Sequence, residues 1–199
     1  MLAELEALSI AQFHDAKLAS PGWPQDAPGG GSAWHWIHAN HRCNTLLWHE
    51  DARMRSAGIA PHDVAAIQRR VSLHEEQRAD AIEGIDEAIL DQLATVAHGA
   101  SARLSSESAG QMIDRMSALS LKLWHMRLQT LRTDAGPKHV HACTRKLRRL
   151  TIQRGDLGGC LDQLLADARR GRAYFKIYLR FKMDDVSAHA CASGAGPAP

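Results

Sequence analysis

The strongest indication of the fold is the segment KHVHACTRKLRRLTIQRGDLGGCLDQLLADARR, residues 138–170. Its apolar residues recur in alternating steps of three and four, the repeat of a helix that buries one stripe against partner helices. One position of that stripe is Arg154, where the pattern requires an apolar side chain. A buried guanidinium must be paired or neutralised by a ligand, so this segment predicts a polar site inside a helical bundle. The apolar members of the stripe are Val140, Cys143, Leu147, Leu150, Leu157, Leu161, Leu164 and Ala168.

The rest of the chain extends this pattern to an all-α fold. We expect an antiparallel helical bundle of four long helices, with a short N-terminal helix and an extended C-terminal segment. Pro- and Gly-rich breakers separate the helices, most clearly SPGWPQDAPGGGS at 20–32 and the Gly136–Pro137 pair. Ser108, followed three residues later by Gln111, predicts a capping box at one helix start. The expected helices span 2–18, 33–56, 61–97, 108–132 and 138–170.

The domain organisation follows from these boundaries. We expect an N-terminal helix and Pro/Gly-rich loop at 1–32, a helical bundle domain at 33–184 and a disordered tail at 185–199. Within 173–183 apolar and polar residues alternate, which predicts an extended segment. No sheet is expected for this segment to join. It would drape over the bundle, pair with a second subunit in a homodimer, or adopt a helix in spite of its pattern.

Composition and charge narrow the function classes. No apolar run is long enough for a membrane span, and the acidic N-terminus argues against an export signal, so we expect a cytoplasmic protein. The four cysteines are scattered without a CxxC pair, as expected of reduced thiols. Residues 1–114 carry a net charge of −8 and residues 115–182 carry +12. The acidic half can balance the basic half by internal pairing, and no nucleic-acid-reading motif is present, so nucleic acid is not the expected partner.

Polar residues also interrupt the apolar stripes of other expected helices, as Arg154 does in residues 138–170. Asn44 and Asp51 lie on the stripe of the second expected helix, and His74 and Arg78 on that of the third. At the start of the fourth helix Asp114 and Arg115 flank the stripe. We expect one layer across the bundle, formed by Asn44, Asp51, His74, Arg78 and Arg154. The layer would be either a ligand site or a satisfied ion-pair network that sets helix register.

A second polar cluster is acidic. Asp80, Glu83 and Asp86 follow one another at intervals of three residues. Glu50 and Asp51 would face them from the preceding antiparallel helix. Carboxylates from two helices can hold Mg²⁺ or Mn²⁺ and position a phosphate. The pair Glu83 and Asp86 matches the ExxD element of all-helical nucleotide pyrophosphatases, but their ExxE element is absent here. The alternative is a solvated acidic face without a metal.

The run RLSSESAGQMIDRMSALSLKLWHM at 103–126 resembles the signature of an uncharacterised bacterial family of all-helical proteins, known as a domain of unknown function. Genes of similar proteins often lie beside glycosyltransferases of surface-polysaccharide assembly, and the resemblance implies that setting. This chain departs from the family pattern at Ala79, where Asn is expected, and at Ala109, where Pro is usual. Further similar pieces are LWHEDAR (47–53), QRADAIEGID (77–86), QRGDLGGCLDQLL (153–165) and KIYLRFKM (176–183).

These observations favour an internal site for a small anionic metabolite, either phosphorylated or a nucleotide sugar. Cationic and amide side chains would bind the anion, and acids and a histidine would bind a metal or transfer protons. The residues do not decide whether a reaction takes place. The expected substrate-binding residues are Asn44, Arg78, Arg115, Lys122, His125 and Arg154, and the expected catalytic residues are Asp51, Glu83, His74 and Asp114.

The alternative function is a non-catalytic accessory protein for a glycosyltransferase. In that case the polar layer is purely structural, and the basic residues 145–149 and the extended segment form the working surfaces. The two hypotheses differ in whether function survives when Arg154 and its partner are both replaced by matched apolar residues in a protein that stays folded.

Overall fold

The computed structural model describes residues 5–20, 31–56 and 59–177. It confirms the all-α class, since five helices account for most of the described chain and the strands are only two residues long. The predicted tail at 185–199 and the last residues of the extended segment lie outside the described residues. The helices are α1 (Ala7–Ala19), α2 (Ala33–Met54), α3 (Pro61–Leu93), α4 (Ala109–Thr130) and α5 (Pro137–Arg169).

Local sequence signals set the helix starts. The two longest helices, α3 and α5, each begin with a proline, whose fixed φ suits the first helical turn. The predicted capping box at α4 is confirmed: Ser108 Oγ accepts from the Gln111 N–H at 3.2 Å, and the Gln111 side chain accepts from the Ser108 N–H at 2.9 Å. Helix α3 ends at Leu93, four residues before the predicted end.

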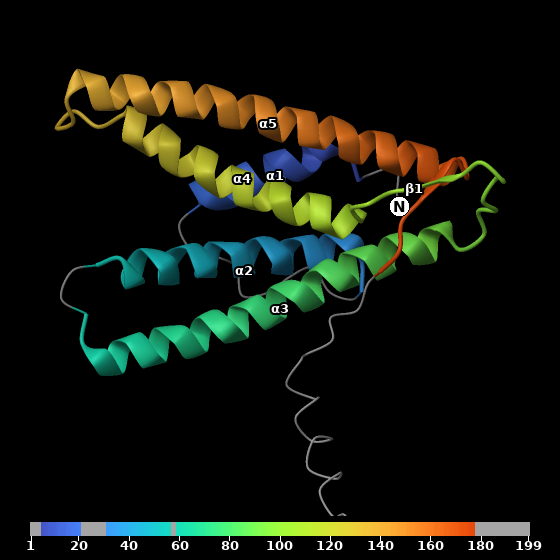
Figure 1. Cartoon of the computed structure of the whole chain (residues 1–199), viewed down its shortest axis with the longest axis horizontal. Coiled ribbons are helices and arrows are strands. Elements are labelled where there is room, and N and C mark those ends of the chain that lie inside the picture. The colour runs from blue at the N-terminus through green and yellow to red at the C-terminus, as the bar shows by residue number, and fades with distance from the viewer. Residues whose placement is uncertain (1–4, 21–30, 57–58, 178–199) are drawn as a thin grey trace, which may run out of the picture.

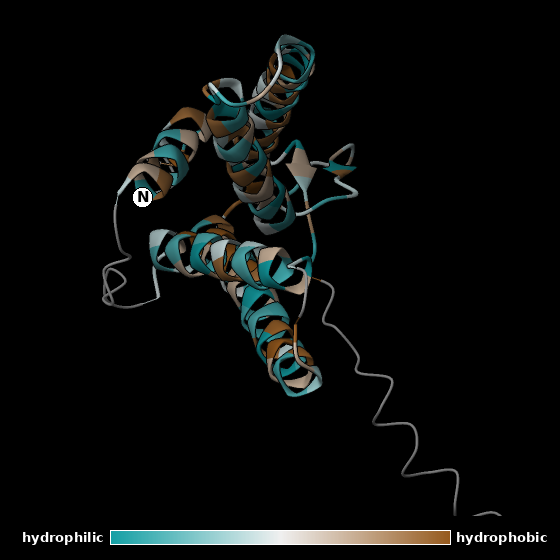
Figure 2. Ribbon diagram, turned by 90° about the vertical axis from the view of Figure 1, so that its left-hand side faces the viewer, coloured by the Kyte–Doolittle hydropathy of each residue, from teal (hydrophilic) through white to brown (hydrophobic). Residues whose placement is uncertain are grey.

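The helices are arranged as two pairs that meet at α4. Helix α2 packs along α3, and α4 packs along α5, as Figure 1 shows. Helix α4 also contacts α1, α2 and α3, so every other helix touches it. Figure 2 shows brown, apolar residues and teal, polar residues along the same helices, and the buried apolar ones form one shared core. The polar residues on the inner face of α4 therefore lie at the centre of the molecule.

One apolar core joins the N-terminal helix to the rest. Leu5, Ala7 and Ile10 at the start of the chain share a cluster with side chains of α2, α3, α4 and α5. Glycines allow close approach at two places in this core. A Cβ on Gly158 would lie 3.0 Å from the Ala7 methyl, and one on Gly110 would lie 2.5 Å from the Ile82 carbonyl oxygen. Burial of this shared apolar surface holds α1 against α4 and α5.

The extended segment pairs within the same chain, which the sequence did not predict. Strand β2 (Ala173–Tyr174) lies parallel to β1 (Arg103–Leu104), and the Ser105 N–H donates to the Tyr174 carbonyl at 2.8 Å. Gly171, with φ of +65°, makes the turn that leads from α5 into β2. This pairing brings residues 105–108 and residues 175–177 to the N-terminal end of α4.

None of the described helices combines the length and the apolar character that crossing a membrane requires.

The contact between α2 and α3 gives a stability prediction. A Cβ on Gly84 of α3 would overlap the indole of Trp36, so Gly84→Ala must push the ring or the helix away. We expect the free energy of unfolding to fall by roughly 1–3 kcal/mol, measured by urea denaturation. Gly159→Ala on α5 is the control, because nothing lies within 4 Å of the position that its Cβ would take and alanine favours the helix. Equal stability of the two variants would contradict the proposed contact.

Candidate functional site

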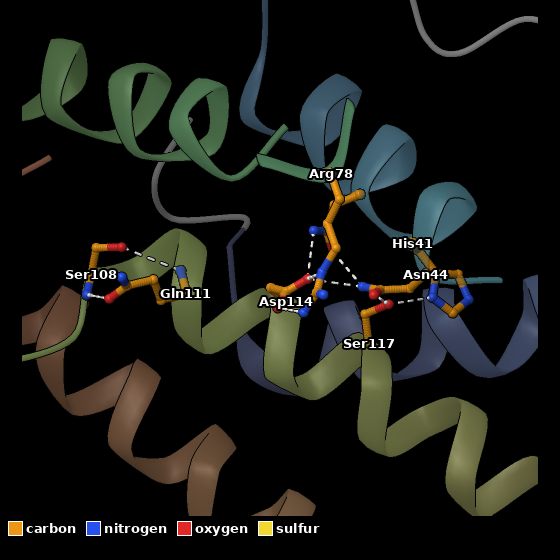
Figure 3. Close-up of polar contacts among 8 residues, drawn as sticks. His41, Asn44, Arg78, Ser108, Gln111, Asp114 and Ser117 are labelled. Carbon is orange, nitrogen blue, oxygen red and sulfur yellow. Dashed lines mark hydrogen bonds and ion pairs between the residues drawn. The ribbon is translucent and has the colours of Figure 1, made fainter. Parts of the chain in front are cut away.

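The centre of the polar site is the carboxylate of Asp114, on the first turns of α4. Its side chain is buried, and it accepts two hydrogen bonds from the Arg78 guanidinium, from Nε at 2.7 Å and from Nη2 at 2.5 Å. The amides of Asn40 and Asn44 on α2 donate to the same carboxylate, each at 2.9 Å. Figure 3 shows the arginine from α3 and an asparagine from α2 converging on Asp114. Three helices are thus joined at one buried charge.

The network continues through Ser117, one turn along α4. The Asn44 amide also donates to Ser117 Oγ at 3.1 Å, and His41 Nδ1 lies 2.7 Å from that hydroxyl. The His41 ring in turn packs on His14 of α1, with ring centroids 4.3 Å apart. Both histidines are fully buried. A line of polar side chains therefore runs from α3 through α4 and α2 to α1 (Figure 3 shows its first part).

Burial and hydrogen bonding set the charge states in this line. Burial alone would raise the pKa of Asp114, but the hydrogen bonds from Arg78 and the two asparagines outweigh it and hold the pKa below its usual value. The same pairing raises the pKa of Arg78. Burial lowers the pKa of His41 to about 4. Burial also lowers the pKa of His14, and the neighbouring His41 and Arg154 lower it further by charge repulsion. The site therefore holds an ion pair beside two neutral imidazoles.

Arg154 is paired, but it lies outside the cluster around Asp114. Its guanidinium makes two hydrogen bonds to Asp15 of α1, at 2.7 and 3.0 Å, and donates to Ser120 Oγ at 2.9 Å. The expectation that Arg154 meets Arg78 in one layer is wrong, because α5 packs on α4 and α1 and makes no comparable contact with α3. The need for a partner was predicted from the pattern, whereas the partner, Asp15, was not.

A pocket of about 430 Å³ opens beside the Arg78–Asp114 pair. We call it the Arg78 pocket; it lies between α3, the N-terminal end of α4 and the segment that follows β2. The line of polar side chains that begins at Arg78 is therefore open to solvent at its α3 end. The pocket is lined by Arg78, Ala79, Ile82, Glu83, Asp86, Ser106, Glu107, Ser108, Gln111, Asp114, Arg115, Lys176 and Ile177.

The charges in the Arg78 pocket are only partly paired. Arg115 binds Glu107 through a single nitrogen, Nη1, which donates to both carboxylate oxygens at 2.5 and 2.6 Å. Glu83 and Lys176 form no ion pair within residues 5–20, 31–56 and 59–177. One carboxylate and one ammonium are thus available to a ligand, in addition to the exposed edges of two arginines.

Asp86 is the second buried acid of the pocket. Its Oδ1 accepts from the Gly110 N–H at 2.6 Å, so it satisfies one of the unpaired amides at the N-terminus of α4. Burial raises the pKa of Asp86 to about 6; hydrogen bonds to Ser108 and Gly110 act in the opposite direction without cancelling the effect. This carboxyl can gain or lose a proton near neutral pH.

The predicted metal set of Glu50, Asp80 and Asp86 is not brought together. Glu50 is buried and bound by Arg70 through hydrogen bonds of 2.8 and 3.0 Å, whereas Asp80 is exposed and lines a different pocket. Asp80 and Asp86 lie on different faces of α3, and Glu50, on α2, is bound by Arg70 and not placed beside either of them. Among the described residues no group of three or more His, Cys, Asp or Glu side chains could hold a metal ion.

Four further predicted site residues lie away from the Arg78 pocket. Asp51 is exposed and pairs with Arg55 one turn along α2, and His74 contacts Gln77 on α3. Lys122 and His125 lie on α4 well beyond Asp114, on the side of Trp48. The helical repeat put Asp51 and His74 on the stripe, whereas Lys122 was suggested by the family resemblance. A shift of one residue rotates a side chain by about 100° around the helix, so neither signal fixes the pocket that a residue faces.

Sequence reasoning also missed members of the network. The missed network residues of α2 and α4 recur at helical spacing along each helix. That repeat of polar side chains is the pattern from which a buried polar network could have been predicted. His14 and Asp15 stand on a short helix whose position relative to α5 could not be inferred. The missed residues are His14, Asp15, Asn40, His41, Ser117, Ser120 and Lys176.

Comparison with known proteins identifies the family. A family model described as a protein of unknown function, DUF4254, matches residues 34–177, which include the Arg78 pocket and every residue of the Asp114 cluster. No curated protein and no solved structure matches the chain. The description of the family names no activity. Since the match covers well over half of the sequence, this chain belongs to the DUF4254 family of proteins of unknown function.

Proposed function

We propose that this protein binds a small phosphorylated metabolite that also bears hydroxyl groups, a nucleotide sugar or a sugar phosphate, in the Arg78 pocket. The pocket presents guanidinium and ammonium groups, which bind phosphate, beside carboxylates, which accept hydrogen bonds from hydroxyls. Its volume of about 430 Å³ falls within the range of roughly 300–1,000 Å³ typical of small-molecule sites.

The observation that carries the proposal is the state of Arg78. Asp114 holds Nε and Nη2, while Nη1 has no hydrogen-bond partner among the described residues and 35% of the side chain is exposed. The guanidinium is therefore fixed in place from behind and open toward the pocket. A donor that is already oriented loses little conformational entropy when an anion binds.

Arg115 and Lys176 supply further positive charge on the same pocket. Glu107 holds Arg115 at the pocket through Nη1, and the pairing of β2 with β1 brings Lys176 there. Glu83 and Asp86 are the acids available to hydroxyl groups of the ligand or to a divalent ion that accompanies its phosphate.

A transferase or hydrolase is an extension of this binding proposal. A carboxyl whose pKa lies at about 6, such as that of Asp86, can act as a general acid or base near neutral pH. In this proposal Asp86 replaces Asp51 and His74, which do not line the pocket, as the group that moves a proton. The setting we propose is the cytoplasm, as expected from the composition, and the neighbourhood of surface-polysaccharide assembly, which the resemblance of residues 103–126 implies.

The accessory role remains the second candidate, and one observation favours it. Arg145, Lys146, Arg148 and Arg149 are exposed on α5 and form no salt bridge within the described part of the chain. A glycosyltransferase with an acidic surface would complement them. This candidate predicts that ligands of the Arg78 pocket have no effect on the protein.

A thermal-shift screen of nucleotide sugars and sugar phosphates, with and without Mg²⁺, tests the proposal. We expect at least one of them to raise Tm, and Arg115→Gln and Lys176→Gln each to weaken its binding roughly ten-fold. Arg132→Gln is the matched control, because Arg132 forms a similar exposed pair with Asp134, away from the pocket. No stabilisation by any ligand, or equal losses in all three variants, would overturn the proposal.

A further inference from the structure

A second cavity, on the opposite half of α4, shares no residue with the Arg78 pocket. It has a volume of about 360 Å³ and is lined by Trp48 of α2, Lys122 and Met126 of α4, and Lys146, Arg149 and Leu150 of α5. We call it the Trp48 groove. It contains Lys122, which sequence reasoning assigned to the metabolite site, and adjoins His125, which was assigned there as well.

The walls of the Trp48 groove are apolar although half of its residues are cations. The indole of Trp48 stacks on His125, with ring centroids 4.4 Å apart and an interplanar angle of 11°, so its orientation is held. Met126 and Leu150 add aliphatic surface. Long basic side chains lay their methylene stems along apolar surface and keep their charged ends in water, so Lys122, Lys146 and Arg149 surround the groove with positive charge.

The rim of the groove carries positive charge that nothing in the described part of the chain offsets. Lys122, Lys146 and Arg149 form no ion pair within the described residues, and no acidic residue among them lines the groove. Three like charges around one apolar cavity repel each other and favour any anion that enters between them. A ligand that complements this groove therefore has an apolar body and a negative charge.

The shape of the groove indicates how large that ligand is. Gln129 lies two helical turns from Lys122 on the same face of α4, and His139 lies two turns from Lys146 on the same face of α5. The His139 Nε2 and Gln129 Oε1 atoms are 3.1 Å apart, so a polar contact bridges the two helices there. This bridge limits the groove in one direction and favours a small molecule over a long polypeptide helix.

We infer that the Trp48 groove is a binding site for a small amphiphilic organic anion, whose ring or acyl chain packs on Trp48 and Leu150 while its carboxylate, sulfonate or phosphate group binds the Lys122, Lys146 and Arg149 rim. The inference is independent of the proposed function, because the two sites have no residue in common.

Anilinonaphthalene sulfonate, a flat apolar anion, is the probe for this site, and decanoate is the competitor. Titration of the full-length protein, followed by fluorescence and calorimetry, should give one saturable site from which decanoate displaces the dye. The triple variant Lys122→Gln, Lys146→Gln, Arg149→Gln should weaken binding roughly 30-fold. The variant Lys138→Gln, Arg145→Gln, Arg148→Gln is the control; it removes the same charge from exposed positions outside the groove and should retain the affinity.

A second pair of variants tests the apolar wall. Leu150→Asp places an anion on the floor of the groove and should abolish dye binding, whereas Ile152→Asp alters an exposed position of the same helix and should not. Circular dichroism and urea unfolding establish that each variant is folded. A titration that never saturates overturns the inference. The inference is also overturned if the two triple variants bind the dye with equal affinity, or if the two aspartate variants do.

Discussion

Replacement of Asp114 by asparagine should lower the free energy of unfolding by about 2 kcal/mol, less than breaking a fully buried ion pair costs, because Arg78 is partly open to solvent. The substitution keeps the size of the side chain but leaves the Arg78 guanidinium without its counter-charge. The asparagine also cannot accept every hydrogen bond that the carboxylate accepts from Arg78, Asn40 and Asn44. Urea denaturation near neutral pH measures the loss.

The double variant Arg78→Gln, Asp114→Asn separates the charge effect from the loss of packing. It removes both charges and leaves an amide pair, so it should recover more than half of the lost stability. If the proposed function is right, the recovered protein binds no phosphorylated ligand, because the fixed guanidinium is gone. A double variant as unstable as Asp114→Asn would show that the pair matters through something other than its charges.

Replacement of Asp86 by asparagine should stabilise the protein by about 3 kcal/mol at about pH 8, because a pKa near 6 instead of 3.8 makes the buried carboxylate costly. When the pH lies between these two pKa values, Asp86 is more often protonated in the folded state than in the unfolded state. The contribution of Asp86 to stability therefore falls as pH rises through that window and stays low above it. Asparagine has no such penalty and can still accept the Gly110 N–H.

The buried histidines act with the opposite sign. Burial lowers the pKa of His41 from 6.5 to about 4 and also lowers that of His14, so the unfolded state binds more protons in that range. Their contribution to stability is lost as pH falls below the unfolded value. In the wild type Asp86 partly offsets this loss, and Asp86→Asn should make the acid-side decline steeper.

Unfolding free energies of the wild type and Asp86→Asn across about pH 4 to pH 8 measure both effects. Asp91→Asn, at an exposed position of the same helix, is the matched control and should leave the profile of the wild type unchanged. If Asp86→Asn were less stable than the wild type at the alkaline end, the charged carboxylate would be a favourable helix cap and not a buried penalty.

The features that the sequence predicted are those that depend on neighbours along the chain. The helix positions follow from periodicity, from prolines at helix starts and from glycines between helices, and the capping box at Ser108 needs only residues within one turn. The need for a partner at Arg154 also followed from its place on an apolar stripe. Each of these depends on backbone geometry and burial that a single helix already defines.

The choice of partners came only from the packed helices. Arg154 binds Asp15, which lies 139 residues away on α1, and Glu50 binds Arg70 of α3. The pairing of β2 with β1, which brings Lys176 to the Arg78 pocket, was likewise not visible in the pattern. Periodicity states which face of a helix is buried, but the rotation and axial offset of one helix against another result from packing of the whole core. The amino-acid order therefore established that charges are buried in this protein, and the packing of the helices set which charges meet and where they open to solvent.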